Sequence, residues 1–247
     1  MLATFGSRLQ DWARPVVDFA LPPRCPGSGT IVDGDNRFCL GCWSTLRFIG
    51  PPWCAGCNTP FEFERPAESL CAQCLSEPPV HDGVKAAVQY GDVAKRVVLR
   101  LKYARRIGLA RLAGRHMARH LPDDARDWTM IPVPLHRWRI WSRGFNQSML
   151  IARELATISG AAIDCDSVVR LRNTKPLRGL RKADRVKMVC GAFAVTPGGR
   201  DQIARKSIVL IDDVYTSGAT TAEIVKLLKR SGAKRVMVLW WARVLLD

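Results

Sequence analysis

The chain has 247 residues, 47% of them hydrophobic, so it can bury the core of one large domain or of a medium domain joined to a small module. Its 38 Lys and Arg against 22 Asp and Glu give a net charge of +16, which favours polyanionic partners such as phosphorylated small molecules or nucleic acid. No apolar run approaches the roughly 18 residues of a membrane-spanning helix, so we expect no stable membrane insertion.

The first 20 residues predict an amphipathic helix. Leu2, Phe5 and Leu9, followed by Trp12 and Val16, recur at spacings of three and four residues. We expect this helix to pack on its own protein, with binding to a membrane surface as the alternative. Because the segment lacks a compact apolar region followed by a small-residue cleavage site, we also expect no secretion and a cytoplasmic location.

Residues 21–80 predict a zinc-ribbon module. Seven of the nine cysteines lie from Cys25 to Cys74, and six of these form three C-x-x-C pairs. Without a secretion signal, this pattern is typical of thiolate metal ligation in a reducing compartment. The segment is rich in Pro and Gly and has little apolar periodicity, so we expect a metal ion to hold it together.

Two sets of cysteines can provide the ligands. The complete set has the C-x2-C-x13-C-x2-C spacing of a closed zinc site and consists of Cys54, Cys57, Cys71 and Cys74. The second set is a degenerate copy that consists of Cys25, Cys39 and Cys42. Ser28 stands where its fourth cysteine would be, with Asp33 or Asp35 as an alternative fourth ligand. The spacing also allows the pair at 39 and 42 to share an ion with the pair at 54 and 57.

From residue 81 to 247 the pattern alternates between strands and helices. We expect strands at residues 84–90, 128–134, 207–212 and 235–242, and helices at residues 92–103, 109–120, 146–158 and 220–231. Asp92 is expected to cap the first of these helices and Gly160 to end the third. Such alternation predicts an α/β fold, in which a Rossmann-like parallel sheet is covered by helices on both faces.

Two adjacent aspartates end the strand at 207–212. Asp212 and Asp213 follow four aliphatic residues at the carboxyl end of this strand, where parallel sheets bind ligands, and we expect both carboxylates to be solvated. The next loop leads into a helix N-terminus, whose unpaired N–H groups suit a phosphate. It consists of Thr216, Ser217, Gly218, Ala219 and Thr220. We therefore predict a sugar-phosphate site, with ribose hydroxyls on the aspartates and the 5-phosphate in the loop. The alternative is a polar turn in which one aspartate caps the helix.

This stretch resembles the phosphoribosyl-diphosphate signature of type I phosphoribosyltransferases, although Ser217 stands where many members carry a second threonine. Two longer runs, KAAVQYGDVAKRVVLRLKYARRIGLARLAGRHMA and IPVPLHRWRIWSRGFNQSMLIARELA, are similar to the ComF family of competence-associated proteins. The RGFNQ run at residues 143–147 is the most distinctive part. The resemblance covers nearly the whole chain from about residue 21, and it implies a zinc module followed by a phosphoribosyltransferase-type domain.

The resemblance also implies roles for basic residues. His136 and Arg137, with Arg143 nearby, would face pyrophosphate. The basic segment around residues 178–187 would be the mobile loop that closes over the substrate. Its basic side chains are those of Arg178, Arg181, Lys182 and Arg185. Leu177 and Met188 replace a glutamine and an asparagine that are usual in the family, so two polar groups of the family pattern are missing.

Two functions are compatible with these features. In the first, the protein binds phosphoribosyl diphosphate with Mg²⁺, and Asp212 and Asp213 take part in transfer of the phosphoribosyl group to a nitrogen acceptor. No residue is an evident general base, which agrees with a metal-assisted displacement. In the second, the protein is not an enzyme. It senses a nucleotide or sugar phosphate and holds single-stranded DNA for the DNA-uptake machinery, through phosphate contacts and base stacking. The candidate stacking residues are Trp43, Trp53, Trp138 and Trp141.

Overall fold

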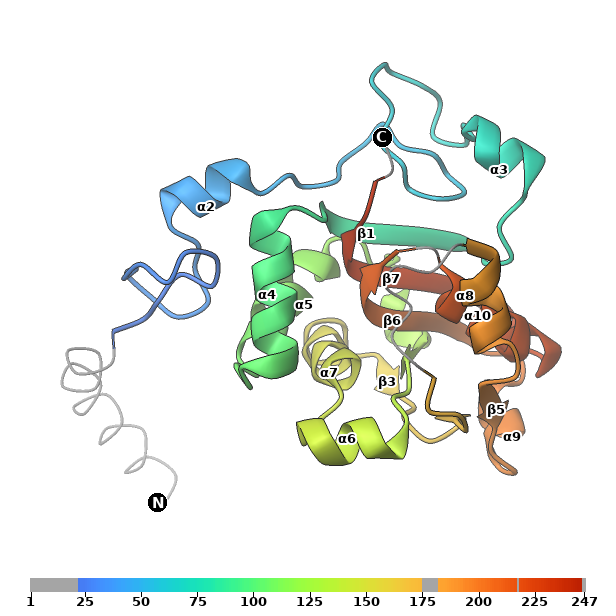
Figure 1. Cartoon of the computed structure of the whole chain (residues 1–247). Helices are drawn as coiled ribbons and strands as arrows, with labels where there is room; N and C mark the ends of the chain where they lie inside the picture. The colour runs from blue at the N-terminus through green and yellow to red at the C-terminus, as the bar shows by residue number, and fades with distance from the viewer. Residues whose placement is uncertain (1–21, 175–181, 217, 246–247) are drawn as a thin grey trace, which may run out of the picture.

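Five parallel strands form the central sheet of the computed structural model, which describes residues 22–174, 182–216 and 218–245 (Figure 1). In spatial order they are β1 (Gly83–Gln89), β7 (Arg235–Arg243), β6 (Ser207–Tyr215), β2 (Thr129–Pro132) and β3 (Ala162–Ile163). The predicted α/β fold with a parallel sheet is confirmed. The predicted helix at residues 1–20 lies outside the described residues, as do Arg178, Arg181 and Ser217.

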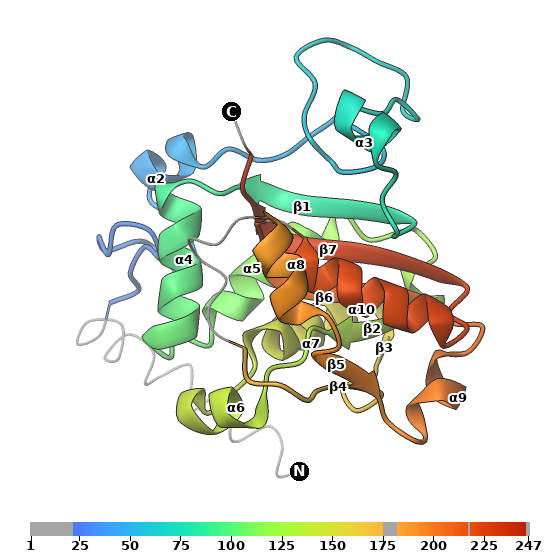
Figure 2. The same ribbon diagram turned by 45° about the vertical axis from the view of Figure 1, so that its right-hand side comes forward.

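Helices cover both faces of the sheet. One face packs against α4 (Asp92–Tyr103), α5 (Leu109–Ala118) and α7 (Gln147–Ser159). The other face packs against α10 (Ala219–Arg230), which also contacts α8 (Lys182–Val189) (Figure 2). Along β6, Val209 and Ile211 belong to the core on the α7 side, whereas Ile208 and Leu210 belong to the core on the α10 side. Burial on both faces explains why β6 is a nearly continuous apolar run.

The remaining elements are short. η1 (Ala125–Asp127) leads into β2, and α6 (Arg137–Arg143) connects β2 to α7. β4 (Val168–Arg170) and β5 (Phe193–Val195) form an antiparallel pair, and α9 (Gly199–Ile203) follows them. The cysteine-rich segment contains α2 (Leu40–Thr45) and α3 (Ala72–Ser76). Within the described ranges, no helix combines the length and the apolar character needed to cross a membrane.

Most predicted elements lie close to their expected positions, and the differences have local causes. β6 continues three residues beyond Asp212, because its ladder with β7 extends to Arg243. Asp92 is the first residue of α4 and not its N-cap, which is Gly91. Gly160 ends α7 in the left-handed conformation, with φ 74°, as predicted.

The cysteine-rich segment lies along the outer edge of β1. The backbone at residues 47 and 49 forms hydrogen bonds with Gln89 (2.8 Å) and Ala87 (3.0 Å). Asn58 is fully buried, and its Oδ1 accepts a hydrogen bond from the Ala86 N–H at 2.8 Å. These bonds join the segment to the sheet at several points of one strand.

Candidate functional site

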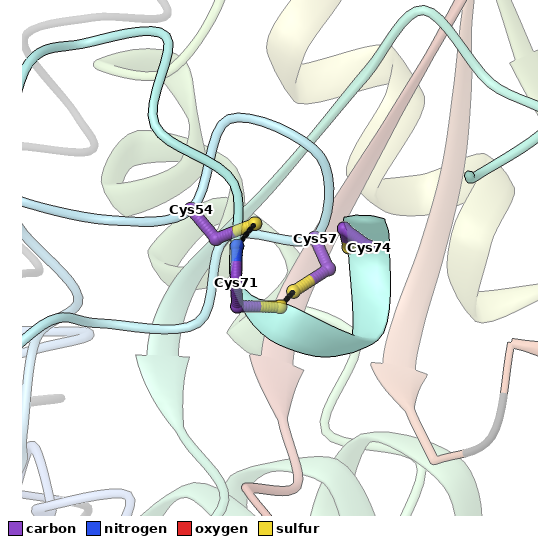
Figure 3. A group of neighbouring side chains, drawn as sticks. All are labelled: Cys54, Cys57, Cys71 and Cys74. Carbon is purple, nitrogen blue, oxygen red and sulfur yellow. Dashed lines mark hydrogen bonds between the residues drawn. The ribbon is translucent and has the colours of Figure 1, made fainter. Parts of the chain in front are cut away.

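Four cysteines converge in the second half of the cysteine-rich segment. The ligand atoms of Cys54, Cys57, Cys71 and Cys74 all lie within 4.8 Å of one another (Figure 3). The Cys71 N–H donates a hydrogen bond to Cys54 Sγ at 3.2 Å. Four thiolates grouped in this way fit a tetrahedral zinc ion with Zn–S distances of about 2.3 Å. We call this cluster the second ribbon site.

The thiols of the second ribbon site differ in acidity. Burial opposes ionisation of Cys57, but hydrogen bonds from Thr59 and the charge of Arg243 lower its pKa to about 7. Burial and the neighbouring Cys57 raise the pKa of Cys74. Because only thiolates bind zinc, Cys57 gives up its proton more easily than Cys74 when the metal binds.

The first half of the segment repeats this geometry with one ligand changed. The ligand atoms of Cys25, Cys39 and Cys42 lie within 4.8 Å of one another, and Ser28 Oγ lies 3.4 Å from Cys39 Sγ. The turn at Cys25 is closed by a hydrogen bond from its N–H to the carbonyl five residues on, and the turn at Cys54 is closed in the same way, both at 2.8 Å. Ser28 therefore lies where Cys57 lies in the other half. This first ribbon site has three thiols and a hydroxyl.

The alternative ligand arrangements do not occur in the structure. Asp33 forms an ion pair with Arg37 at 2.7 Å, and neither Asp33 nor Asp35 groups with the cysteines. The cysteine pair at 39 and 42 and the pair at 54 and 57 lie in separate clusters. The pair at 39 and 42, at the start of α2, thus clusters with the turn at Cys25. The pair at 71 and 74, at the start of α3, clusters with the turn at Cys54.

Helix α4 holds the turn of the first ribbon site. Arg100 Nη1 donates hydrogen bonds to the carbonyls of Cys25 (3.1 Å) and Pro26 (2.7 Å). Arg96 Nη1 donates to the Gly27 carbonyl at 3.4 Å. Cys25 and Cys42 are buried in the apolar core on this side of the sheet. Packing and backbone contacts therefore stabilise this half, which lacks the fourth thiolate.

The two aspartates of β6 have different surroundings, because successive residues of a strand point to opposite faces. Asp213 is only 4% exposed, and Lys102 Nζ from α4 lies 2.6 Å from its Oδ2. Asp212 is half-buried, and its Oδ1 accepts hydrogen bonds from the Ser148 hydroxyl (3.0 Å) and from the Asp213 N–H (2.9 Å). The expectation of two solvated carboxylates is wrong for Asp213, because α4 covers it.

Burial and neighbouring charges set the ionisation of this pair. Burial and the adjacent Asp213 carboxylate raise the pKa of Asp212 to about 7. Burial opposes the charge on Lys102, but Asp213 outweighs it and the pKa of Lys102 is raised. The pair thus contains one carboxylate in a firm ion pair and a second carboxylate, Asp212, whose charge changes near neutral pH.

The loop after β6 forms a helix N-terminus that suits an anion. Gly218 is the N-cap of α10, with φ 69°, and its carbonyl accepts the first hydrogen bond of the helix, from Ala222 (2.7 Å). The N–H groups of residues 219–221 precede this bond and have no partners within the helix. A cavity of about 40 Å³ lies here, lined in part by Asp212, Tyr215, Thr216, Gly218, Ala219 and Thr220.

Gly218 is required at this position for two reasons. Its positive φ disfavours other residues, and a Cβ atom on it would lie 2.6 Å from Tyr215 Cε2. The Tyr215 ring therefore lies directly against the loop backbone. The ring thus packs at the start of α10.

A larger, basic cavity adjoins the acidic pair through Lys102. Its volume is about 500 Å³, and its lining includes Lys102, Tyr103, Arg105, Arg139, Arg143 and Gln147. These residues come from the end of α4 and the residues after it, from α6 and from the start of α7. Lys102 contacts Asp213, whereas Asp212 lines the loop cavity. The acidic pair therefore connects two features that attract anions.

Among the residues expected on the pyrophosphate side, Arg143 lines the basic cavity, and its Nη1 donates a hydrogen bond to Gln147 Oε1 at 2.5 Å. The other two do not. His136 is buried and caps α6 by accepting a hydrogen bond from the Trp138 N–H at 3.4 Å. Arg137 lies over the Trp138 ring.

The basic segment expected to be a mobile loop is helical from Lys182 onward, as α8. Arg185 is half-buried on this helix, and Val189 at its end is buried. The Gly191 N–H then donates a hydrogen bond to Glu223 Oε1 of α10 at 2.8 Å. Residues 182–187 are therefore helical and not a loop, because this part of the segment packs against α10, whereas closure over the substrate stays a prediction.

The sequence reasoning missed Lys102, Arg105, Arg139 and Ser148. A signal for Lys102 was present, because it follows Ala94 and Val98, both buried, at helical spacing. A charged residue that continues the apolar stripe of a helix needs a buried partner. No comparable signal marks the other three residues.

A family model matches the cysteine-rich segment, and several known proteins are similar to most of the chain. A family model described as a double zinc ribbon domain matches residues 16–75, so the cysteine-rich segment is a zinc-ribbon module that binds structural zinc. Competence protein F of Haemophilus influenzae is 27% identical over 221 residues, which cover 87% of this chain and 94% of that protein. The DNA utilization protein YhgH of Salmonella typhimurium is 34% identical over 186 residues, which cover 71% of this chain and 78% of that protein.

Among solved structures, the glutamine phosphoribosylpyrophosphate amidotransferase of B. subtilis aligns with a TM-score of 0.37 and 18% identity. The alignment covers 70% of this chain and 31% of that enzyme, so the chain spans less than a third of the enzyme's length.

Proposed function

The chain belongs to the ComF family of competence and DNA utilization proteins, and on that premise we propose that it binds phosphoribosyl diphosphate and transfers the phosphoribosyl group to a nitrogen acceptor in the handling of DNA taken up by the cell. The observation that carries this proposal is the position of Asp212 and Asp213. One lines a helix N-terminal loop and the other is ion-paired to a lysine of a basic cavity. A sugar with an anionic group at each end and hydroxyls between them matches this arrangement.

Each part of the ligand has a matching group on the protein. The 5-phosphate would accept hydrogen bonds from the N–H groups of residues 219–221 and from the Thr220 hydroxyl. The ribose hydroxyls would donate to Asp212, which is the less buried carboxylate and is not ion-paired among the described residues. The pyrophosphate would lie in the basic cavity, near Arg139 and Arg143.

Mg²⁺ is part of this proposal as a companion of the ligand. In the described part of the chain, no group of three acidic side chains forms a cation site, and Asp213 is already paired with Lys102. This donor set fits an ion that is held chiefly by phosphate oxygens and water, with Asp212 as the available carboxylate. Bound in this way, Mg²⁺ would neutralise the pyrophosphate as it leaves.

The transfer itself would depend on electrostatics. The bond from the sugar carbon to pyrophosphate breaks, the electron pair leaves with pyrophosphate, and the acceptor nitrogen forms the new bond and loses a proton to solvent. The chain's contribution is to hold both anionic ends of the donor and to place the Asp212 carboxylate near the sugar, where positive charge develops.

Two neighbouring arginines of α6 provide the experiment. Arg139→Gln removes a charge from the basic cavity, whereas Arg137→Gln removes one from the same helix outside it. Titration calorimetry with phosphoribosyl diphosphate and Mg²⁺ should give about tenfold weaker binding for Arg139→Gln, because charge-assisted hydrogen bonds contribute roughly 1.5 to 3 kcal/mol. The Arg137→Gln control should bind as the wild type does. Pyrophosphate release with a panel of nitrogen acceptors then tests the transfer, and a wild-type protein that binds no donor would refute the proposal.

A second candidate function, binding of single-stranded DNA, is favoured by the surface of α6. None of its residues is buried, and Trp138 and Trp141 are 56% and 80% exposed, with their rings edge to face at 6.2 Å. Arginines flank them at positions 137, 139 and 143. Exposed aromatic rings beside basic groups are the pattern on which bases stack.

Fluorescence anisotropy with an oligothymidine tests this second function. Trp141→Ala should weaken binding about tenfold, because stacking contributes roughly 1 to 3 kcal/mol per base. Affinity should also fall steeply with salt. Trp43→Ala is the control, since Trp43 is half-exposed but packs on Phe48. Equal affinities of both variants and the wild type would exclude α6 as the DNA surface. Binding of the wild type to anionic vesicles but not to DNA would assign α6 to a membrane surface instead.

A further inference from the structure

Arg243 is a buried cation without a carboxylate partner. It ends β7 and is only 7% exposed. None of the ion pairs among the described residues includes it, and its Nε and Nη1 have no hydrogen-bond partner there. A buried guanidinium is costly unless a negative charge lies nearby, so its partner has to be found elsewhere.

A hydrogen bond of the Arg243 side chain leads to the second ribbon site. Arg243 Nη2 donates a hydrogen bond to Thr59 Oγ1 at 2.9 Å, and Thr59 Oγ1 lies 3.0 Å from Cys57 Sγ. Since the Thr59 oxygen accepts from Arg243, its own proton is free to point at the sulfur, as a thiolate requires. Zn²⁺ with four thiolates carries two net negative charges, which the Arg243 guanidinium offsets in part.

Arg243 also contacts an aromatic ring at the end of β6. Its guanidinium carbon lies 4.9 Å from the centre of the Tyr215 ring, and Tyr215 is its register partner on β6. The same ring packs on Trp240, with ring centres 4.4 Å apart, and lies against Gly218. One cation thus contacts both a zinc-ribbon turn and the aromatic ring that supports the start of α10.

We propose that Arg243 is a positioning residue that couples zinc binding at the second ribbon site to phosphate binding at the start of α10, at residues 218–221. With zinc bound, the thiolates hold Arg243 through Thr59, and Arg243 holds Tyr215 against Gly218. Without zinc, Arg243 loses its negative partner and is held less firmly over the Tyr215 ring, which keeps its packing on Trp240. Because such coupling is reciprocal, a phosphate in the loop strengthens zinc binding by the same factor. The phosphate half of this coupling rests on the proposed function, whereas the zinc half does not.

Two arginines of β7 provide a matched pair of variants. Arg235 at the other end of the strand also lies over an aromatic ring, that of Trp128, at 4.5 Å, and it pairs with Asp124. Arg243→Gln should release zinc to a chelating dye about tenfold or more faster than wild type, as expected for the loss of an outer partner of a metal ligand. Arg235→Gln should release zinc at the wild-type rate. Arg243→Lys keeps the charge and should recover most of the loss.

The effect on the loop is measured with and without a ligand. Hydrogen exchange of the amides at residues 218–222 should be faster in Arg243→Gln and in Cys74→Ser, and unchanged in Arg235→Gln. Calorimetry with ribose 5-phosphate should give about tenfold weaker binding for each of the first two variants. Their double variant should be no weaker than the weaker single one, because both break the same connection.

The outcomes separate the two proposals. Wild-type zinc release and loop exchange in Arg243→Gln, or additive losses in the double variant, would overturn the coupling. If wild-type protein does not bind ribose 5-phosphate, the proposed function fails. The zinc-release and exchange measurements still decide the role of Arg243 in that case.

Discussion

Replacing Lys102 with methionine should destabilise the protein more than replacing its partner Asp213 with asparagine. Lys102 Nζ and Asp213 Oδ2 lie 2.6 Å apart, and the lysine and aspartate side chains are 22% and 5% exposed. Methionine keeps the packing of the lysine stem but leaves a buried carboxylate without its cation. Removal of one partner of a buried pair costs about 3 to 5 kcal/mol, and we expect the lower end because Lys102 reaches solvent in part.

The Asp213→Asn variant should lose less, about 1 to 2 kcal/mol. The ammonium of Lys102 is the more exposed partner, and Asp212 still attracts it. The double variant Lys102→Met/Asp213→Asn removes the uncompensated charge. It should therefore be more stable than Lys102→Met alone, although it has two substitutions.

Urea denaturation measures these differences. With a slope of about 1 to 3 kcal/mol per M, a loss of about 3 kcal/mol lowers the midpoint by about 1 to 3 M. Lys95→Met is a suitable control, because Lys95 lies on the same helix and forms no ion pair among the described residues. Additive losses in the double variant would refute the reasoning, because they would mean that Asp213 gains nothing from Lys102.

Three further predictions concern zinc, pH and the loop. Elemental analysis should find one zinc ion per chain after dialysis. The Ser28→Cys variant should contain two, because the new cysteine completes four thiols at the first ribbon site. An unchanged zinc content would show that Ser28 is not in a ligand position. Ribose 5-phosphate should bind more tightly as pH rises from 6 to 8, because the pKa of Asp212 is raised to about 7 and its charged form accepts the ribose hydroxyls. Below pH 7, binding should displace a proton from Asp212, which calorimetry in two buffers would detect. The same raised pKa means that ionisation of Asp212 lowers the free energy of unfolding as pH rises from about 4 to 7, and Asp212→Asn should abolish both effects. Gly218→Ala should weaken ribose 5-phosphate binding about tenfold, because a left-handed residue with a Cβ costs roughly 1 to 2 kcal/mol, whereas Gly41→Ala, with open space around it, should bind as the wild type does.

The elements with strong periodicity could be predicted from the sequence. The long strands β6 and β7 and the helices α4, α7 and α10 lie near their expected bounds, because an apolar pattern reflects the faces that a parallel sheet buries. The cysteine clusters follow from spacing alone, since a short chain between two thiols limits where they can meet. Helix α8 was not expected because the family resemblance assigned its segment to a loop, and its packing on α10 depends on a tertiary contact.

The candidate site was only partly predictable for a similar reason. Asp212 and Asp213 are adjacent in sequence, but their burial depends on which face of the strand each occupies and on what covers that face. Lys102 covers Asp213 from a helix far away in the chain, and no local pattern joins the two. His136 was expected to face pyrophosphate because of the family resemblance, whereas its buried ring caps the helix that follows. Local sequence shows which groups are available, and tertiary packing decides which of them meet.

The contact between the cysteine-rich segment and β1 has a consequence for the solubility of the protein. β1 is an outer strand of the sheet, and a bare outer strand offers a row of unpaired N–H and C=O groups on which a second copy can pair. Residues 47 and 49 and the side chain of Asn58 occupy part of that row. A chain shortened to residues 81–247 would expose it, and such a fragment should associate edge to edge. Because zinc should keep the ribbon folded against this strand, we expect loss of the metal in a cell to appear first as insoluble protein.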